Sequence, residues 1–235
     1  QLLEQKADAL LKLEILTYEK HGRRLLGVSR EALNRITTLA LAYRLKKDER
    51  YLQQLEREMR SVCTFKDWNP SHFLDVAEMA CAVALGLDWA GEYISPELSG
   101  MAKNALVEKA LKPGIAASAN NFWKGVDHNW NLVCNGGLAM AALVVFEDEP
   151  ELSSAILHQA VETIPLALHP FAPSGVYPEG VSYWSYATAY LTLTISAFES
   201  ALGTDFGFTD YPGIMESSNF SMLMAGPSGS YYNYF

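Results

Sequence analysis

Cysteine is scarce in this 235-residue sequence, which holds Cys63, Cys81 and Cys134 and no others. An odd number of cysteines at these spacings fits neither a disulfide framework nor a zinc-binding pattern. A cysteine without such partners usually behaves as a small apolar group inside the fold. We therefore expect all three thiols to be buried, and we assign them no chemistry.

Long apolar runs are missing as well. The longest, such as "LAMAALVVF" at 138–146, fall well short of the roughly 20 residues that a membrane-spanning helix needs. The opening stretch, "QLLEQKADALL", has the pattern of an amphipathic helix and lacks the apolar centre of a signal peptide. We expect no membrane span and see no signal peptide, and the first residue need not be the native start.

Clusters of basic residues are also absent. The sequence has 18 lysines and arginines against 27 aspartates and glutamates, for a formal net charge of -9. No basic block with interleaved aromatics occurs, and the net charge repels a polyanion at long range. Nucleic acid is therefore not an expected partner, and any acidic ligand must be held by local groups.

What the sequence does contain is helical periodicity. Hydrophobic residues make up 49% of the chain and charged residues 19%, as in globular proteins. Apolar residues recur at intervals of three and four in eight segments: 2–18, 30–46, 49–63, 73–87, 97–111, 132–146, 151–168 and 183–202. Ser29, Ser71 and Ser95 stand where helix N-caps are expected. Strand-like alternation appears in "GPSGSYYNYF", so we predict an all-α domain over 1–225 and the start of a β-rich domain at 226–235.

Helices of this length joined by short loops pack as antiparallel hairpins. The absence of a fixed repeat favours a closed ring of hairpins over a solenoid. Two connections are longer than packing requires: "KPGIAASANNFWKGVDHNWN" at 112–131 and "HPFAPSGVYPEGVSYW" at 169–184. Long loops rich in glycine, proline, asparagine and aromatics on a rigid scaffold commonly carry function.

Three motifs follow one another on the predicted helices: "WNPSHFLDVAEMACAVALGLDW", "HNWNLVCNGG" and "YPEGVSYWSYATAYL". In this order they resemble the heparinase II/III-like polysaccharide lyases and their alginate lyase relatives, over about residues 65–235. The resemblance implies an incomplete (α/α) toroid followed by a β domain in the parent chain. It further implies β-elimination on an acidic polysaccharide or oligosaccharide, a periplasmic or secreted location, and no cofactor.

The chemistry of that reaction requires particular residue types. Removing the C5 proton of a uronic acid builds charge beside the sugar's carboxylate, which must be neutralised. A base must take the proton, and an acid must protonate the departing oxygen. The resemblance assigns the acid–base pair to His128 and Tyr183 and carboxylate neutralisation to Asn129. The register stays open, because Asn131, Asn135 and Tyr186 lie within about one helical turn of these positions.

Further residues of the two long loops are candidates for binding the glycan. The predicted substrate-binding set comprises Trp123, Trp130, Asn131, Glu179, Trp184 and Tyr186, in which the tryptophan rings would stack on sugar faces. Each has a competing structural interpretation. The tryptophans could fill the core, Asn131 could N-cap a helix beginning at Leu132, and Tyr186 could join a buried aromatic stripe. Glu179 could serve as an ordinary carboxylate at a helix terminus.

Two other classes of function remain open. A glycoside hydrolase would need two facing carboxylates, for which the loops offer Asp127 and Glu179. A non-catalytic glycan-binding domain would keep the tryptophans and need no acid–base pair. On the helix at 73–87, "HFLDVAE" places His72, Asp75 and Glu78 at intervals of three. We interpret these three as support for the helical wall and expect no metal site.

Overall fold

The computed structural model describes residues 1–232 and is all-helical over that range, as predicted. Isolated antiparallel bridges join His21 to Arg24 and Ala225 to Tyr231, and no strand occurs among the described residues. None of the described helices is long and apolar enough to cross a membrane, in agreement with the sequence.

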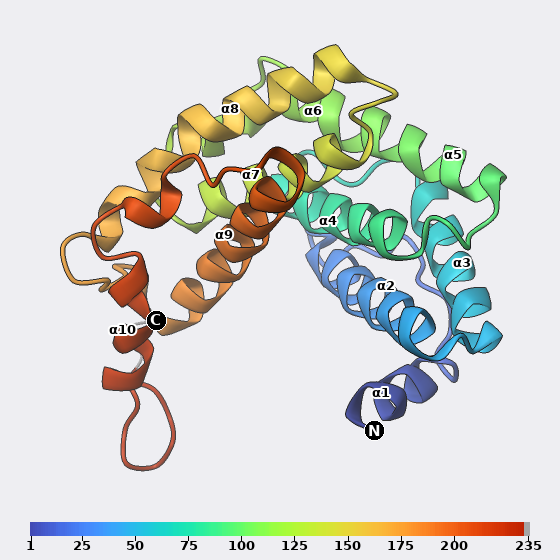
Figure 1. Ribbon diagram of the computed structural model, residues 1–235, viewed down its shortest axis with the longest axis horizontal. Coiled ribbons are helices and arrows are strands. Elements are labelled where there is room, and N and C mark those ends of the chain that lie inside the picture. The colour runs from blue at the N-terminus through green and yellow to red at the C-terminus, as the bar shows by residue number, and fades with distance from the viewer. Residues whose placement is uncertain (233–235) are drawn as a thin grey trace. The chain divides into compact units, whose positions relative to one another are not determined.

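The helices follow one another along the whole chain (Figure 1). The α-helices are α1 (Leu2–Leu10), α2 (Leu26–Lys46), α3 (Glu49–Thr64), α4 (Phe73–Ala90), α5 (Pro96–Leu106), α6 (Lys112–Ile115), α7 (Asn129–Val144), α8 (Pro150–Leu168), α9 (Gly180–Leu202) and α10 (Ser218–Leu223). A π-helical turn, η1 (Val107–Leu111), follows α5, and 3-10 turns form η2 (Ala119–Gly125), η3 (His169–Phe171), η4 (Phe208–Asp210) and η5 (Met215–Ser217).

The chain forms two compact units. Unit 1 comprises residues 1–121 and 137–156, and unit 2 comprises residues 122–136 and 157–235. Helices α7 and α8 each contribute residues to both units. Both long loops singled out in the sequence end in unit 2, which therefore contains the predicted site.

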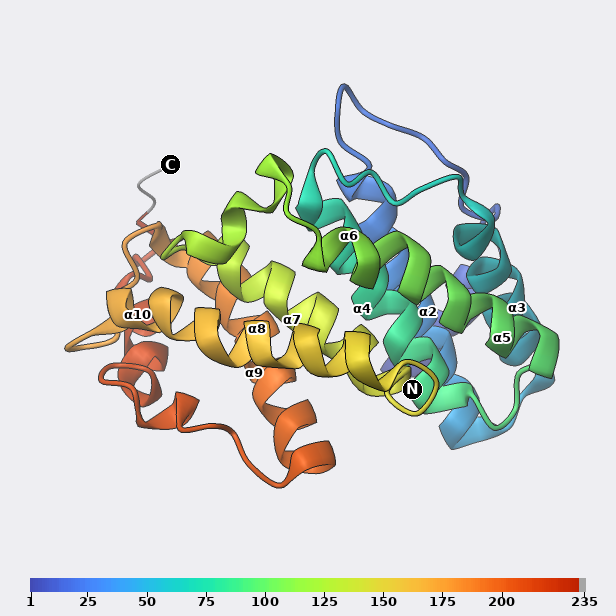
Figure 2. The ribbon, with the colours of Figure 1, turned by 90° about the horizontal axis from the view of Figure 1, so that it is seen from above.

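Unit 1 is built around α4, which is buried along nearly its whole length because most of its residues are apolar and its buried carboxylates have partners. Helices α2, α3 and α4 lie side by side (Figures 1 and 2). Gly137 of α7 allows close packing on α4, because a methyl group added there would lie 2.2 Å from the Ala77 carbonyl oxygen. In unit 2, a methyl group at Gly136 would lie 2.8 Å from Thr194 Oγ1 on α9. Both glycines serve close packing.

Tertiary contacts change several of the predicted helix boundaries. The first helix ends at Leu10, and not at Tyr18, because the backbone further on bonds to α3. There the Leu16 N–H donates to Glu58 Oε2 at 3.2 Å, and the Leu16 carbonyl accepts from Ser61 Oγ at 2.6 Å. The predicted helix at 97–111 is divided, since its last turn is π-helical.

The predicted N-caps have different outcomes. Ser95 caps α5, and its hydroxyl accepts the Leu98 N–H at 3.3 Å. Ser29 is not a cap, because α2 begins at Leu26 and the buried Ser29 hydroxyl donates to the Asp75 carbonyl at 2.8 Å. Ser71 does not cap α4 either; its hydroxyl donates to Asn69 Oδ1 at 2.9 Å.

The polar residues of α4 lie in a buried network. His72 Nδ1 is 2.6 Å from Asp75 Oδ1, and Asp75 Oδ2 accepts from the Leu25 N–H at 2.6 Å. Glu78 pairs with Arg30 at 2.9 Å. These contacts tie α4 to the start of α2, and residues 1–232 hold no group of three or more histidine, cysteine or acidic side chains that could bind a metal.

The cysteines are free and buried, as expected. Burial raises the pKa of the Cys63 and Cys81 thiols to about 12, so both stay protonated near neutral pH. At the other end of the chain, the predicted start of a β-rich domain at 226–235 lies partly outside the described residues. Within them, the Gly226 N–H donates to the Ser230 carbonyl at 2.7 Å and closes a turn.

Candidate active site

The two motifs that carry the family resemblance meet in unit 2 through one contact. The Asn129 backbone N–H donates to Glu179 Oε2 at 2.8 Å, and Asn129 Nδ2 donates to Glu179 Oε1 at 2.7 Å. Asn129 is the first residue of α7, and Glu179 immediately precedes α9. His128 is the neighbour of Asn129, and Tyr183 follows Glu179 by about one helical turn, or about 6 Å of rise. The contact therefore brings His128 and Tyr183 into one region.

Glu179 is held firmly in this position. Its carboxylate accepts a backbone N–H at the positive end of α7, where a negative charge is favoured. The Tyr177 hydroxyl donates to Glu179 Oε2 at 3.0 Å. Burial raises the pKa of Tyr177, and the negative charges of Glu179 and Asp127 raise it further. Tyr177 thus stays protonated and donates its hydrogen bond over the whole physiological pH range.

A second buried network fixes the first turns of α7. Asn131 Nδ2 donates to the carbonyls of Val126 and Thr163, both at 3.0 Å. Asn135 Nδ2 donates to Asn131 Oδ1 at 3.0 Å and to Thr163 Oγ1 at 2.9 Å. The N-cap interpretation of Asn131 is wrong, since α7 begins at Asn129 and the Asn131 amide joins the preceding loop to α8. Asn131 is fully buried and engaged, so it holds the loop and does not face a substrate.

Several buried polar atoms in this region have no hydrogen-bond partner among the described residues. They are His128 Nδ1, Asn129 Oδ1, Asn135 Oδ1 and Trp184 Nε1. Leaving such an atom unpaired costs about 1–3 kcal/mol. Unpaired groups of this kind call for an explanation such as a catalytic role or a missing ligand. Ordered water or a ligand can satisfy such atoms, and their positions in or next to α7 and α9 are consistent with a polar site there.

The two residues of the predicted acid–base pair differ in their exposure to solvent. Tyr183, on the first turn of α9, is 44% exposed, so a substrate can reach it. His128 is half-buried, and its carbonyl accepts the Asn131 N–H at 3.0 Å as α7 begins. Because Nδ1 of His128 has no partner in the described chain, no protein acceptor at that atom fixes the ring tautomer.

The aromatic residues divide into core and surface groups. Trp123 is fully buried at 0% exposure, so its predicted stacking on a sugar is wrong and the core-filling alternative holds. Trp130 is half-buried and contacts the 51% exposed Phe122, with ring centroids 5.0 Å apart. Trp184 and Tyr186 are half-buried on α9, and Tyr186 contacts Tyr190 edge-to-face at 5.7 Å. The Phe122–Trp130 pair is the more accessible platform for a sugar.

The structure adds two residues that sequence reasoning missed. Tyr177 supports Glu179, and the signal for it was present, because it opens the "YPEG" motif itself. Phe122 contributes the exposed half of an aromatic pair, but nothing in its local pattern distinguishes it from a core residue. Asp127 is exposed beside His128.

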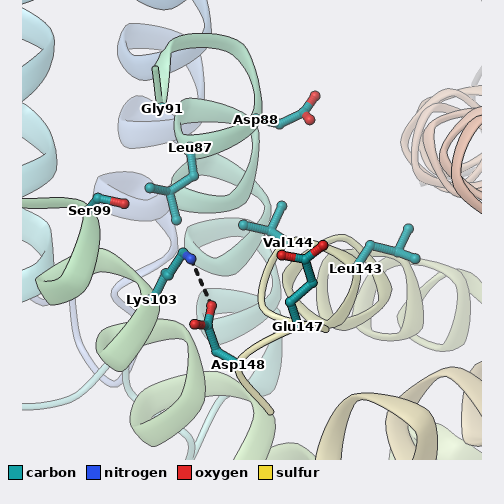
Figure 3. Close-up of a pocket in the computed structure, with 9 residues that line it drawn as sticks. All are labelled: Leu87, Asp88, Gly91, Ser99, Lys103, Leu143, Val144, Glu147 and Asp148. Atoms are coloured by element: carbon teal, nitrogen blue, oxygen red, sulfur yellow. Dashed lines mark hydrogen bonds and ion pairs between the residues drawn. The ribbon is translucent and has the colours of Figure 1, made fainter. Parts of the chain in front are cut away.

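A pocket lies within unit 1, and none of the predicted site residues lines it (Figure 3). Its volume is about 390 Å³, and its lining residues are Leu87, Asp88, Gly91, Ser99, Lys103, Leu143, Val144, Glu147 and Asp148. In its lining, the Lys103 and Asp148 side chains point toward each other and pair at 2.7 Å. With its one cation already paired and two more carboxylates in the lining, this pocket does not suit an acidic ligand.

Comparison with known proteins identifies no family. No protein-family model matches the chain, and no curated protein matches it either. The functional argument therefore rests on the motifs and on the geometry of unit 2.

Proposed function

We propose that this chain is the catalytic helical domain of a polysaccharide lyase that cleaves a uronic-acid-containing glycan by β-elimination. The observation that carries the proposal is the Asn129–Glu179 contact, with both hydrogen bonds shorter than 3 Å. It supports the proposal because His128 directly precedes Asn129 and the exposed Tyr183 follows Glu179 by four positions, and because nearby buried polar atoms have no partner among the described residues.

In this mechanism His128 and Tyr183 form the acid–base pair. One takes the C5 proton of the uronate, and the electron pair left on C5 forms the C4=C5 double bond. The bond between C4 and the glycosidic oxygen breaks, and the other residue gives that oxygen a proton. The reaction balances with no water and no further reactant.

Asn129 is the residue assigned to the substrate carboxylate, but its amide already donates one hydrogen to Glu179. It would act through the second hydrogen of the same nitrogen. The Glu179 carboxylate lies beside it and occupies this side of the amide. Neutralisation by Asn129 alone is therefore weak, and an additional positive group is needed.

The wider proposal concerns the whole protein. We infer an incomplete (α/α) toroid of helical hairpins, the heparinase II/III-like family, a following β domain and a periplasmic or secreted location. The all-helical fold and the succession of helices joined by short loops support this architecture. The location follows from where such polysaccharides occur.

One observation favours a glycoside hydrolase as the second candidate. The negative charges of Glu179 and Asp127 both raise the pKa of Tyr177, and Glu179 also accepts the hydrogen bond of its hydroxyl. However, both oxygens of Glu179 already accept hydrogen bonds from Asn129, and Oε2 also accepts one from Tyr177. Protonating Glu179 would disturb these bonds, which makes it a poor general acid.

The test is to incubate the full-length protein with alginate, heparin, heparan sulfate, chondroitin and hyaluronan and to follow the ultraviolet absorbance of the unsaturated uronate. We expect a rise with the wild type on at least one glycan, and a loss of about 100-fold or more in Tyr183→Phe and His128→Ala. Tyr211→Phe and His21→Ala, which lie outside the candidate site, are the matched controls.

The outcomes separate the candidates. New reducing ends without the ultraviolet absorbance of an unsaturated uronate would overturn the elimination mechanism and favour hydrolysis. Glycan binding without any product would favour a non-catalytic binding domain, and full activity of Tyr183→Phe would remove that residue from the mechanism.

A further inference from the structure

The distribution of positive charge along the sequence is strongly uneven. Of the 18 lysines and arginines, Lys124 alone follows Lys112. Lys124 is therefore the single lysine or arginine of unit 2. The acidic residues of the same unit are Asp127, Glu162, Glu179, Glu199, Asp205, Asp210 and Glu216. Lys124 is the one lysine or arginine side chain that unit 2 itself can offer to an anionic ligand.

The backbone around Lys124 is held against the first turn of α7. On one side, the Phe122 ring contacts Trp130 with centroids 5.0 Å apart. On the other side, the Val126 carbonyl accepts from Asn131 Nδ2 at 3.0 Å. Trp130 and Asn131 directly follow Asn129 in α7. The backbone on both sides of Lys124 is thus anchored to the two residues that directly follow Asn129.

Within the described part of the chain, the Lys124 ammonium makes no ion pair. Among residues 1–232 no carboxylate lies within ion-pair distance of it, although Asp127 is three positions away. Its contact is with the ring of Trp123, 5.6 Å from Nζ to the centroid. Lys124 is half-buried, and burial lowers its pKa. A partly desolvated cation without a counter-charge is stabilised by any anion that reaches it.

We propose that Lys124 binds the carboxylate of the uronate and makes the site specific for acidic glycans. The exposed Phe122 ring, on which a sugar could rest, belongs to the same segment and stands two positions before Lys124. The cation also supplies the positive group that Asn129 lacks while its amide donates to Glu179. This inference rests on the proposed function. The experiments are chosen so that a failure of the Lys124 inference can be told apart from a failure of the lyase proposal.

The first experiment compares Lys124→Gln and Lys124→Arg with wild-type protein, using the glycan that yields the unsaturated product. We expect the KM of Lys124→Gln to rise about tenfold or more, the factor for losing a charge-assisted hydrogen bond. Lys124→Arg should recover most of the affinity. Lys12→Gln is the matched control, because it removes the same charge from an exposed position in unit 1 and should leave KM unchanged.

The second experiment measures binding of the same glycan and of its carboxyl-reduced form by calorimetry. Wild-type protein should prefer the charged form by about tenfold, and Lys124→Gln should lose that preference. An unchanged KM and an unchanged preference in Lys124→Gln would overturn the inference while elimination by the wild type stands. If the wild type produces no unsaturated uronate, the lyase proposal fails. In that case the role of Lys124 is tested by binding alone. The measurement is the preference of wild-type protein and Lys124→Gln for alginate over carboxyl-reduced alginate.

Discussion

At the scale of single residues, Glu179 is the group on which most of the candidate site depends. It receives three hydrogen bonds, two from Asn129 and one from Tyr177. Each donor comes from a segment that flanks a predicted catalytic residue. A substitution there should therefore act on the fold of unit 2 and on catalysis together.

We predict that Glu179→Gln destabilises the protein by about 1–3 kcal/mol, because the amide NH₂ of the new side chain would face another donor. The free energy of unfolding from chemical denaturation measures this. Glu162→Gln, an exposed change of the same chemistry in unit 2, should alter stability by less than about 0.5 kcal/mol. Equal effects of the two changes would show that the hydrogen bonds of Glu179 with Asn129 and Tyr177 contribute nothing to stability.

At the scale of elements, the close approach of α4 and α7 in unit 1 depends on Gly137. A side chain there has no room, because the obstacle is the Ala77 backbone carbonyl and not a flexible side chain. Gly100 in α5 offers the contrast, since an added methyl group there meets no atom within 4 Å.

Gly137→Ala should lower the free energy of unfolding by about 1–3 kcal/mol or more through overpacking. Gly100→Ala should raise it by about 0.5–1 kcal/mol, because alanine is the better helix former. Thermal and denaturant unfolding of both variants provide the measurement. A neutral Gly137→Ala would contradict the tight packing of the two helices.

Element boundaries show where periodicity stops being informative. Segments such as 49–63 and 151–168 were predicted to within a residue or so, because their apolar faces repeat regularly. The first helix was predicted too long, since Leu16 continues the apolar pattern while its backbone bonds to Glu58 and Ser61. Those partners are more than 40 positions away in the sequence, and no local pattern reveals them.

At the scale of the whole molecule, the free energy of unfolding depends on pH through carboxylates such as Asp67. Asp67 accepts hydrogen bonds from the Tyr18 hydroxyl at 2.7 Å and from the Asn69 N–H at 2.9 Å. Burial acts to raise the pKa of Asp67, but these bonds and the nearby Lys66 and Lys20 lower it overall. A folded-state pKa below the unfolded value gives stability that is present above the unfolded pKa and is lost as pH falls through the folded one.

We therefore predict that the wild type loses stability as pH falls from about 5 toward 3, and that Asp67→Asn loses less over the same interval. Near neutral pH the variant should be the less stable protein, because it lacks the charge-assisted acceptor for Tyr18. Denaturant unfolding at a series of pH values measures both effects. Parallel pH profiles for the two proteins would contradict the role of Asp67.

By itself, the sequence determined the all-α class, the burial of the cysteines and the loops in which the candidate site lies, because these follow from composition and local periodicity. Tertiary structure alone decided that Trp123 is in the core, that Asn131 holds a loop, and that Asn129 meets Glu179 across 50 positions. The physical reason is that a side chain's role depends on the partner that packing brings to it. Lys124 is an example: its charge is evident from the sequence, but only the fold shows that no carboxylate of the described residues pairs with it.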